Sequence, residues 1–218
     1  NPADGSPITV PNKEMVLGCY YLTTTEIGEK KDETTLPIFS DSDDAIAAYQ
    51  ARCVGLRELV QVRIDGTMVI TTVGRLLFNE ILPKELRFMN APIKAATIKA
   101  IITKALTHYT KEEVVVLIDA IKDGGFFGAT ICGGLSVSVF DCEMIEGKTD
   151  IIKEAEERVK AVEDNYRQGL ITIEEKKRLA NEIWIEVTEK IADLTWTKLA
   201  TDNPVKMIID SGSARASK

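Results

Sequence analysis

The sequence contains few of the residues that build metal sites or disulfide frameworks. Its 218 residues include one histidine, His108, and four cysteines, Cys19, Cys53, Cys132 and Cys142, none of which belongs to a CxxC pair. Structural zinc sites take their ligands from closely spaced Cys and His pairs, so no zinc site is predicted. A chain of this length buries a core without disulfides, and we interpret the cysteines as reduced thiols of a cytoplasmic protein.

Long apolar runs, a leader pattern and an excess of positive charge are also missing. No stretch approaches the ~18 apolar residues of a membrane span. The start, Asn1–Ser6, shows no basic segment followed by an apolar one, and the chain begins without methionine, which suggests a piece of something longer. With 27 basic against 34 acidic residues the net charge is −7. This balance excludes a general nucleic-acid-binding surface and leaves only local contacts through a few placed residues.

The first two thirds combine strand and helix patterns. Met15–Leu22 is a continuous apolar and aromatic run, typical of a strand buried on both faces. Apolar and polar side chains alternate over part of residues 59–64, and residues 68–70 are apolar. Asp65-Gly66 lies between these two segments and is a hairpin turn signal. Residues 136–140 alternate again. These patterns predict a small sheet in the first part of the chain.

Four helices are predicted in the same region. They cover residues 45–51 behind a Ser-Asp-Asp cap, 74–81, 93–108, and a segment from the capping box Thr110–Glu113 to Lys122. The glycine-rich residues 123–128 follow this last helix and not a strand. A phosphate-binding loop needs the reverse order, so we interpret them as a turn that ends the helix.

The last third has a different character. Apolar residues repeat at steps of three and four, namely Ile152, Ala155, Val159, Val162 and Tyr166, then Leu179, Ile183, Val187, Ile191 and Leu194. Gly169 separates the two series, and a second capping box begins at Thr172. The pattern predicts an antiparallel coiled-coil hairpin, which either projects as a docking surface or packs flat on its domain. A short apolar strand is expected over residues 205–209.

Catalytic patterns are missing. A Ser-His-Asp set cannot be built around one helical histidine, and neither a GxxxxGK[ST] loop nor a DxD-like cluster is present. The acidic residues fall mostly on the outer faces of the two predicted hairpin helices, where solvent exposure is the ordinary state. The residues alone therefore indicate an accessory or binding piece and not a self-contained enzyme.

Six blocks of the sequence resemble one known family. Val10–Thr23 resembles the "VPSQDMVLGLYYLT" stretch of the largest, beta-prime, subunit of bacterial RNA polymerases, and residues 71–79 are similar to its "TTVGRxxFN". The other blocks follow in the same order, at residues 45–49, 119–141, 166–184 and 210–215. The resemblance covers nearly the whole chain.

This resemblance implies an α+β fold with three parts. Residues 1–145 would form a small mixed β/α pore-like domain (domain 3 of the largest subunit), residues 146–203 a funnel, or rim-helix, hairpin (domain 4), and residues 204–218 a segment leading toward the active site. The family uses Mg²⁺, held by the aspartates of an "NADFDGD" loop that the 218 residues do not contain. The chain would belong to a DNA-directed RNA polymerase, a nucleotidyltransferase, yet be inactive alone.

The resemblance also implies site residues. Arg215 matches the arginine of "SGARGS" that lies near the incoming triphosphate, although Ser-Gly-Ser-Ala-Arg is one residue longer here. A guanidinium suits phosphate because it binds two oxygens at once and stays charged. Arg75 is expected either to line the pore or to have a structural role. Regulators would dock at the hairpin tip, Arg167, Gln168, Gly169 and Leu170.

The implied partners are those of a polymerase subunit. They are the beta, alpha and omega subunits with the rest of beta-prime, nucleoside triphosphates and the RNA 3′ end in the secondary channel, template DNA, and secondary-channel transcription factors, with no membrane. The alternative is a free-standing coiled-coil adaptor that binds a partner through the hairpin. A third hypothesis, a small enzyme with an unrecognised site, is not supported by any sequence pattern.

Overall fold

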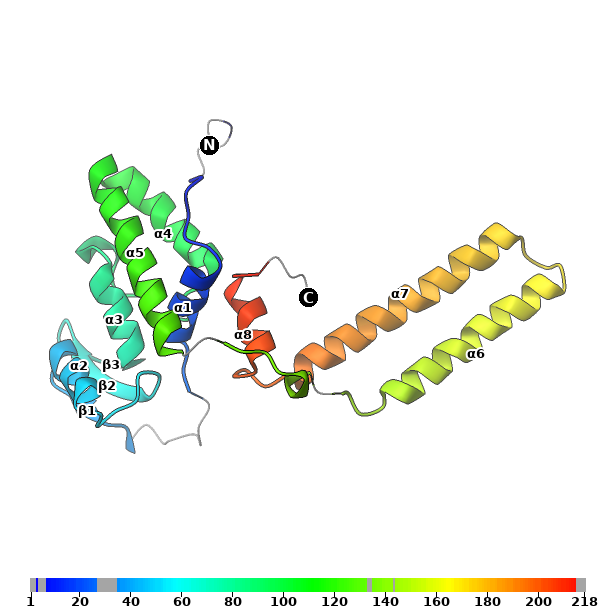
Figure 1. Cartoon of the computed structure of the whole chain (residues 1–218), viewed down its shortest axis with the longest axis horizontal. Helices are drawn as coiled ribbons and strands as arrows, with labels where there is room; N and C mark the ends of the chain where they lie inside the picture. The colour runs from blue at the N-terminus through cyan, green and yellow to red at the C-terminus, as the bar shows by residue number, and fades with distance from the viewer. Residues whose placement is uncertain (1–2, 4–6, 27–34, 133–134, 143, 215–218) are drawn as a thin grey trace. The chain divides into compact units, whose positions relative to one another are not determined.

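A computed structural model describes residues 3, 7–26, 35–132, 135–142 and 144–214 (Figure 1). Eight α-helices lie in this part of the chain: α1 (Glu14–Thr23), α2 (Ser42–Gln50), α3 (Val73–Ile81), α4 (Ala95–His108), α5 (Lys111–Ile131), α6 (Lys148–Arg167), α7 (Ile173–Lys198) and α8 (Pro204–Ser211). Three strands form one sheet: β1 (Ile38–Phe39), β2 (Leu59–Ile64) and β3 (Thr67–Thr72). The predicted α+β class is confirmed.

The chain divides into two compact units. The first contains residues 1–137 together with residues 204–217, and the second contains residues 138–203. Helix α8 therefore belongs to the first unit, although the whole second unit separates it in sequence from the rest. None of the helices within the described ranges is long and apolar enough to cross a membrane.

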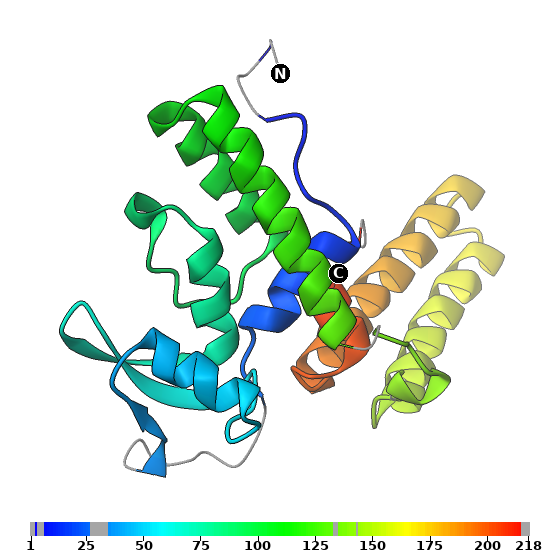
Figure 2. The ribbon, with the colours of Figure 1, turned by 60° about the vertical axis from the view of Figure 1, so that its left-hand side comes forward.

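The sheet confirms the predicted hairpin. β2 pairs antiparallel with β3, and β1 adds to the other edge of β2 in parallel. Asp65 and Gly66 link β2 to β3 with φ angles of 51° and 84°, which is the geometry of a two-residue type I′ turn. Alternate β2 side chains, Val60 and Val62, enter a small core beneath α2 and the start of α3 (Figure 2). Periodicity and turn residues therefore predicted this part correctly.

The strand predicted over Met15–Leu22 is wrong, because these residues form helix α1. A continuous apolar run has no period that separates a buried strand from a buried helix. α1 is buried on several sides, since α5, α3 and α8 all contact it. Its sequence therefore does not show the three- to four-residue spacing of apolar side chains that marks a helix buried on one face only.

The turn predicted at residues 123–128 is also wrong, because α5 continues through the glycines to Ile131. Gly125 and Gly128 face α1, whereas Gly124 faces Ile81 of α3. A Cβ atom added to Gly18 would overlap the carbonyl oxygen of Gly125, and one added to Gly128 would overlap that of Gly18. Glycine lowers helix stability by about 1 kcal/mol relative to alanine, but here it lets two helix backbones approach each other directly.

Two other segments differ from the prediction. Residues 205–209, expected as a strand, lie in helix α8. The alternating residues 136–140 form no strand, and their last two residues begin a short 3-10 helix, η3 (Val139–Asp141). Both segments are short, and a run of about five residues carries too little pattern to separate the alternatives.

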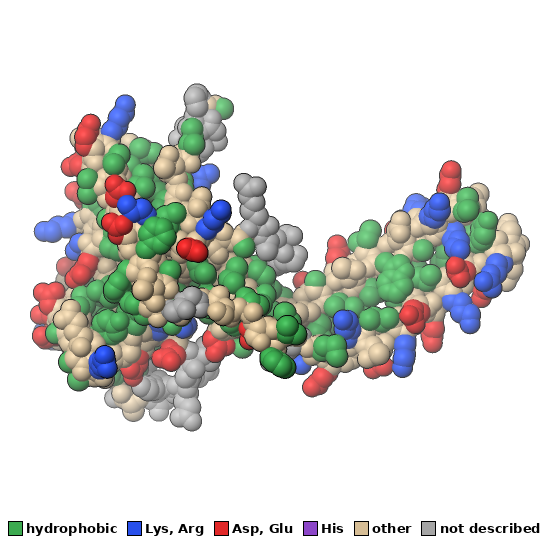
Figure 3. All heavy atoms as spheres, viewed as in Figure 1, with side chains coloured by type: hydrophobic (Ala, Val, Ile, Leu, Met, Phe, Trp, Pro, Cys, Tyr) green, Lys and Arg blue, Asp and Glu red, His purple; other side chains and the backbone are tan. Residues whose placement is uncertain are grey.

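The second unit contains α6 and α7, which lie side by side (Figure 1). Ala155, Ile183 and Val187 form the buried centre of their contact, with Ile151, Val159, Val162 and Ile191 packed around it. Hydrophobic side chains gather between the two helices, and charged ones follow the outer edges (Figure 3). Most of the predicted apolar face is found in this cluster. The exceptions are Ile152, whose place Ile151 takes, Leu179, which is not part of the cluster, and Tyr166 and Leu194, which are exposed.

Candidate functional site

Arg75 lies inside the first unit, one turn into α3. Thr72 caps this helix by accepting a hydrogen bond from the Arg75 amide at 3.3 Å. The Arg75 side chain is 8% exposed. Its Nε donates to the carbonyl oxygen of Thr23 at 2.9 Å, and its Nη1 donates to Asn90 Oδ1 at 3.1 Å. The guanidinium thus connects the end of α1 to the chain that precedes α4.

Asn79, one turn further along α3, extends this connection. Its Nδ2 donates to the carbonyl oxygens of Arg75 and Met89, both at 2.8 Å, and its Oδ1 accepts from the Met89 amide at 2.7 Å. The Thr23 hydroxyl accepts from the Ile93 amide at 2.8 Å. These buried polar groups satisfy one another, as buried hydrogen-bonding groups must. Sequence reasoning singled out Arg75 and missed the network, although Asn79 closes the same "TTVGRxxFN" block.

Burial changes the pKa of Arg75 but leaves the side chain charged. Desolvation lowers the pKa of its guanidinium from the ordinary value. An arginine side chain starts so far above neutral pH that the group remains protonated. Among the described residues no carboxylate forms an ion pair with Arg75, so backbone and amide oxygens alone offset its positive charge.

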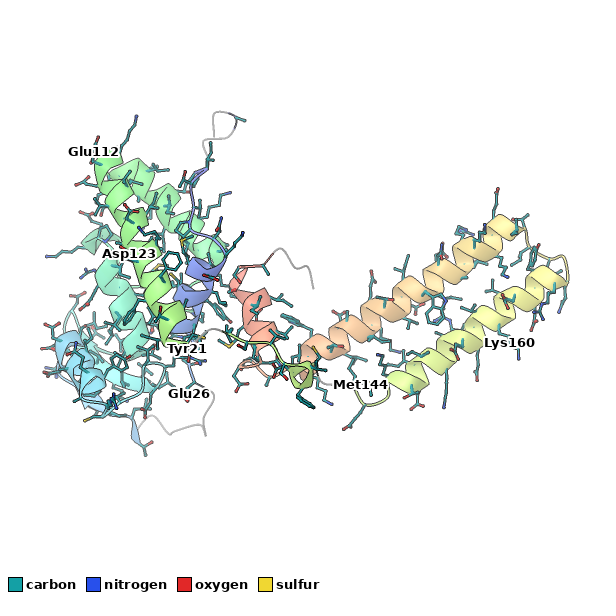
Figure 4. All side chains as sticks on the ribbon, in the orientation of Figure 1. Tyr21, Glu26, Glu112, Asp123, Met144 and Lys160 are labelled. Carbon is teal, nitrogen blue, oxygen red and sulfur yellow. The ribbon has the colours of Figure 1, made fainter. Side chains whose placement is uncertain are left out.

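A second arginine, Arg57, holds the chain that leaves α1. Its guanidinium lies over the ring of Tyr21, 4.5 Å from the ring centroid, and its Nη2 donates to the carbonyl oxygen of Thr25 at 3.1 Å. The Glu26 amide donates to the Arg57 carbonyl oxygen at 3.0 Å. Tyr21 and Glu26 both lie at the C-terminal end of α1 (Figure 4). Cation–π and hydrogen-bond contacts of Arg57 therefore hold the chain where it leaves α1.

The tip residues Arg167, Gln168, Gly169 and Leu170 are all exposed. Gly169 has a φ of 73°, and its amide donates to the Tyr166 carbonyl oxygen at 2.9 Å. The Leu170 amide donates to the carbonyl oxygen of Asn165 at 3.0 Å. This pair of bonds is a Schellman motif, which confirms Gly169 as the predicted C-terminal cap.

Charged side chains support the tip from both helices. Lys176 Nζ contacts Glu163 Oε1 at 2.8 Å and lies 5.4 Å from the ring centroid of Tyr166. Thr172 caps α7 by accepting from the Glu175 amide at 3.2 Å. Further along, Arg158 contacts Glu186 at 2.8 Å, whereas Lys160 points away from α7 (Figure 4). Exposed ion pairs add little stability, so the apolar contact between the two helices is expected to contribute more.

Arg215, the residue expected near the triphosphate, lies outside the described residues. Just before it, Ser211 ends α8, and its hydroxyl accepts from the Ser213 amide at 3.1 Å. Gly212 follows with a φ of 73° and lies beside Ala95 at the start of α4.

The described residues hold no cluster of three or more histidine, cysteine or acidic side chains that could bind a metal ion. All four cysteines are free thiols; Cys19 is buried, and Cys53 and Cys142 are exposed. Burial raises the pKa of the Cys19 thiol to about 12. His108 is exposed in the last turn of α4. Neither Cys19 nor His108 has the surroundings of a nucleophile or a general base.

Comparison with known proteins identifies the class to which this fold belongs. Residues 1–142 match the family described as RNA polymerase Rpb1, domain 3, and the chain belongs to this family. The matched range includes Arg75, Arg57 and the helices that surround them.

Beta-prime subunits of bacterial DNA-directed RNA polymerases are similar to the chain over almost its full length. The subunit of Desulforudis audaxviator is 38% identical over 98% of this chain, and that of Pelotomaculum thermopropionicum is 37% identical over 98%. The subunit of Thermotoga neapolitana is 35% identical over 98%. These matches cover 18%, 18% and 13% of the relatives, respectively. The chain thus spans less than a fifth of their length.

Proposed function

We propose that this chain is part of the largest subunit of a bacterial multisubunit DNA-directed RNA polymerase and contributes to transcription in the cytoplasm. One observation carries the proposal: beta-prime subunits match the chain over 98% of its length at 35–38% identity. The match includes both compact units. A free-standing adaptor built around the hairpin would not need the first unit to be similar as well.

In this proposal, residues 1–145 form a pore-like domain, residues 146–203 the funnel hairpin, and residues 204–218 lead toward the active site. The first unit forms part of the wall of the secondary channel, through which nucleotides enter and backtracked RNA leaves. Arg75 has a structural role there, because its guanidinium is buried and bonded to Thr23 and Asn90. It holds α1, α3 and the chain that precedes α4 in place around the channel.

The second unit is proposed to be an antiparallel coiled-coil hairpin whose tip binds transcription factors at the channel rim. The apolar cluster between α6 and α7 and the ion pairs that bridge them support this arrangement. At the tip, Leu170 offers an exposed apolar side chain. Arg167, three positions before it, offers an exposed cation that also contacts Asp164 at 3.8 Å. A partner with an apolar contact and a carboxylate would be complementary to that pair.

The remaining parts of the proposal concern the assembled enzyme. The beta, alpha and omega subunits and the rest of beta-prime would be the partners, together with template DNA. Arg215 would bind the incoming triphosphate through its planar guanidinium. Two Mg²⁺ ions would be held by residues outside this chain and would stabilise the attacking and leaving oxygens.

Affinity purification of the polypeptide that carries this sequence tests membership of the polymerase. A tag on that polypeptide should recover beta and alpha subunits in stoichiometric amounts. Recovery of the polypeptide without polymerase subunits would instead support the free-standing adaptor.

A separate experiment tests docking at the tip. Leu170→Asp and Arg167→Glu in the assembled polymerase should weaken the binding of a secondary-channel factor at least tenfold in a titration. Lys160→Glu is the matched control, because this side chain is on α6 and points away from α7. Equal affinities for all variants would rule out the tip as the docking site.

A further inference from the structure

The most exposed of the large apolar side chains in the second unit lie at its beginning. Val139 is 86% exposed, Phe140 91% and Met144 79%. Figure 3 shows hydrophobic side chains at the surface around this segment. Single exposed apolar residues are ordinary on a protein surface, but three large ones within six positions form a patch. We call Val139, Phe140 and Met144 the apolar knob.

Local hydrogen bonds hold the backbone of the apolar knob. The Ser138 amide donates to Asp141 Oδ2 at 2.6 Å, and the Phe140 amide donates to the Ser138 hydroxyl at 3.3 Å. Asp141 and Ser138 thus form a reciprocal capping box around η3. Phe140 is the second residue of η3, and its side chain is exposed.

The end of α7 fixes the same segment from the other side. Asn203 Nδ2 donates to the Asp141 carbonyl oxygen at 2.8 Å, and Lys198 Nζ donates to the Met144 carbonyl oxygen at 3.2 Å. Hydrogen bonds on both sides of Phe140 therefore hold the backbone that carries its exposed ring. A preformed apolar contact loses little conformational entropy on binding, and aromatic anchors of this kind are enriched at the centres of interfaces.

We propose that the apolar knob docks into an apolar pocket formed by the remainder of the same polypeptide, which would make it an internal anchor of the largest subunit. The inference rests on the proposed function, since it requires the longer subunit. The relatives show how much further polypeptide is available: the matched region is 13–18% of their length. A pocket on the same chain is met at a much higher effective concentration than one on a separate subunit.

The neighbouring thiol gives a direct probe of this contact. Cys142 is exposed and lies two residues after Phe140, inside the segment that docking would cover. Its rate of maleimide labelling in the full-length subunit, followed by mass spectrometry of the Cys142 peptide, is compared with the rate in the denatured subunit. Docking predicts labelling at least a hundredfold slower in the native subunit before it joins the other subunits.

Substitutions then show whether the knob causes the protection. Phe140→Asp should raise the labelling rate of Cys142 at least tenfold in the full-length subunit, and Phe140→Leu should keep it slow. Ile185→Asp is the matched control, because this exposed apolar side chain of α7 lies outside the knob. Phe140→Ala provides a milder form of the test if the aspartate variant does not fold.

Each other result overturns the proposal in a recognisable way. Fast labelling in both the free and the assembled subunit means that nothing covers the knob. Protection that appears only on assembly assigns the pocket to another subunit, and protection that depends on concentration assigns it to a second copy. These outcomes differ from failure of the proposed function, in which the tagged polypeptide recovers no polymerase subunits at all.

Discussion

At the scale of single residues, the close crossing of α1 and α5 depends on glycine. Gly18→Ala should lower the free energy of unfolding by about 3 kcal/mol, because the new Cβ overlaps the backbone of Gly125 and neither helix axis can move freely. Urea unfolding of the chain measures this. Gly55→Ala is the control, since its nearest neighbour would be a side-chain atom at 3.5 Å, and it should change stability little. Equal effects of the two substitutions would contradict the crossing.

Also at this scale, the Cys19 thiol should make stability depend on alkaline pH. Burial raises its pKa to about 12 from an ordinary value of 9.0. Above pH 9 the unfolded chain releases the thiol proton while the folded chain keeps it, so the free energy of unfolding falls as pH rises toward 12. Urea unfolding above and below pH 9 should show a steeper loss for the wild type than for Cys19→Ala. Parallel pH profiles would show that the thiol is not buried.

At the scale of helices and strands, the sequence predicted the elements that carry their own local signals. The Asp65-Gly66 turn, the Thr110 capping box and the Gly169 cap each depend on residues a few positions apart, and all three are confirmed. For α1 and the glycines of α5 the deciding contact is between segments more than 100 positions apart, Gly18 with Gly125. Local pattern cannot report such a contact, so a strand and a turn were predicted there.

The candidate site likewise contains residues that the sequence identified and contacts that it did not. The tip residues follow from the break between two helical patterns, and Arg75 was identified by the resemblance alone. Its partners Thr23 and Asn90 lie 52 and 15 positions away, and only the folded chain brings them together. The sequence therefore identified the charged residue but did not reveal its hydrogen-bond acceptors.

The cap at the turn between α6 and α7 gives a prediction at this scale. Gly169→Ala should destabilise the second unit by about 1 kcal/mol, because a φ of 73° strains a side chain that has a Cβ. The space around Gly169 is open, so backbone conformation and not a clash would be the cause. Thermal unfolding followed by circular dichroism measures the change, and Gly169→Asn should lose less. A stable alanine variant would argue against the left-handed cap.

At the scale of the whole molecule, the proposed function gives this chain a structural part in a polymerase whose metal ions are held elsewhere. In the first unit, the buried Thr23, Arg75 and Asn79 are linked by hydrogen bonds. In the second unit, the most exposed large apolar side chains are those of the knob and of Leu170 at the tip. Catalysis of phosphoryl transfer needs metal ions held by converging carboxylates. The 218 residues contain no "NADFDGD" segment, and the described acidic side chains do not converge.

The purified chain alone should therefore neither synthesise RNA on a template nor bind Mg²⁺ tightly. Incorporation of labelled nucleotide on a primed template should stay at background, and calorimetric titration with Mg²⁺ should give no saturable heat in the micromolar range. Assembled polymerase that carries the same sequence within its full subunit is the positive control for both assays. Template-dependent synthesis by the chain alone would mean that a catalytic site has been overlooked, and the proposal that the metal ions are held outside this chain would then be wrong.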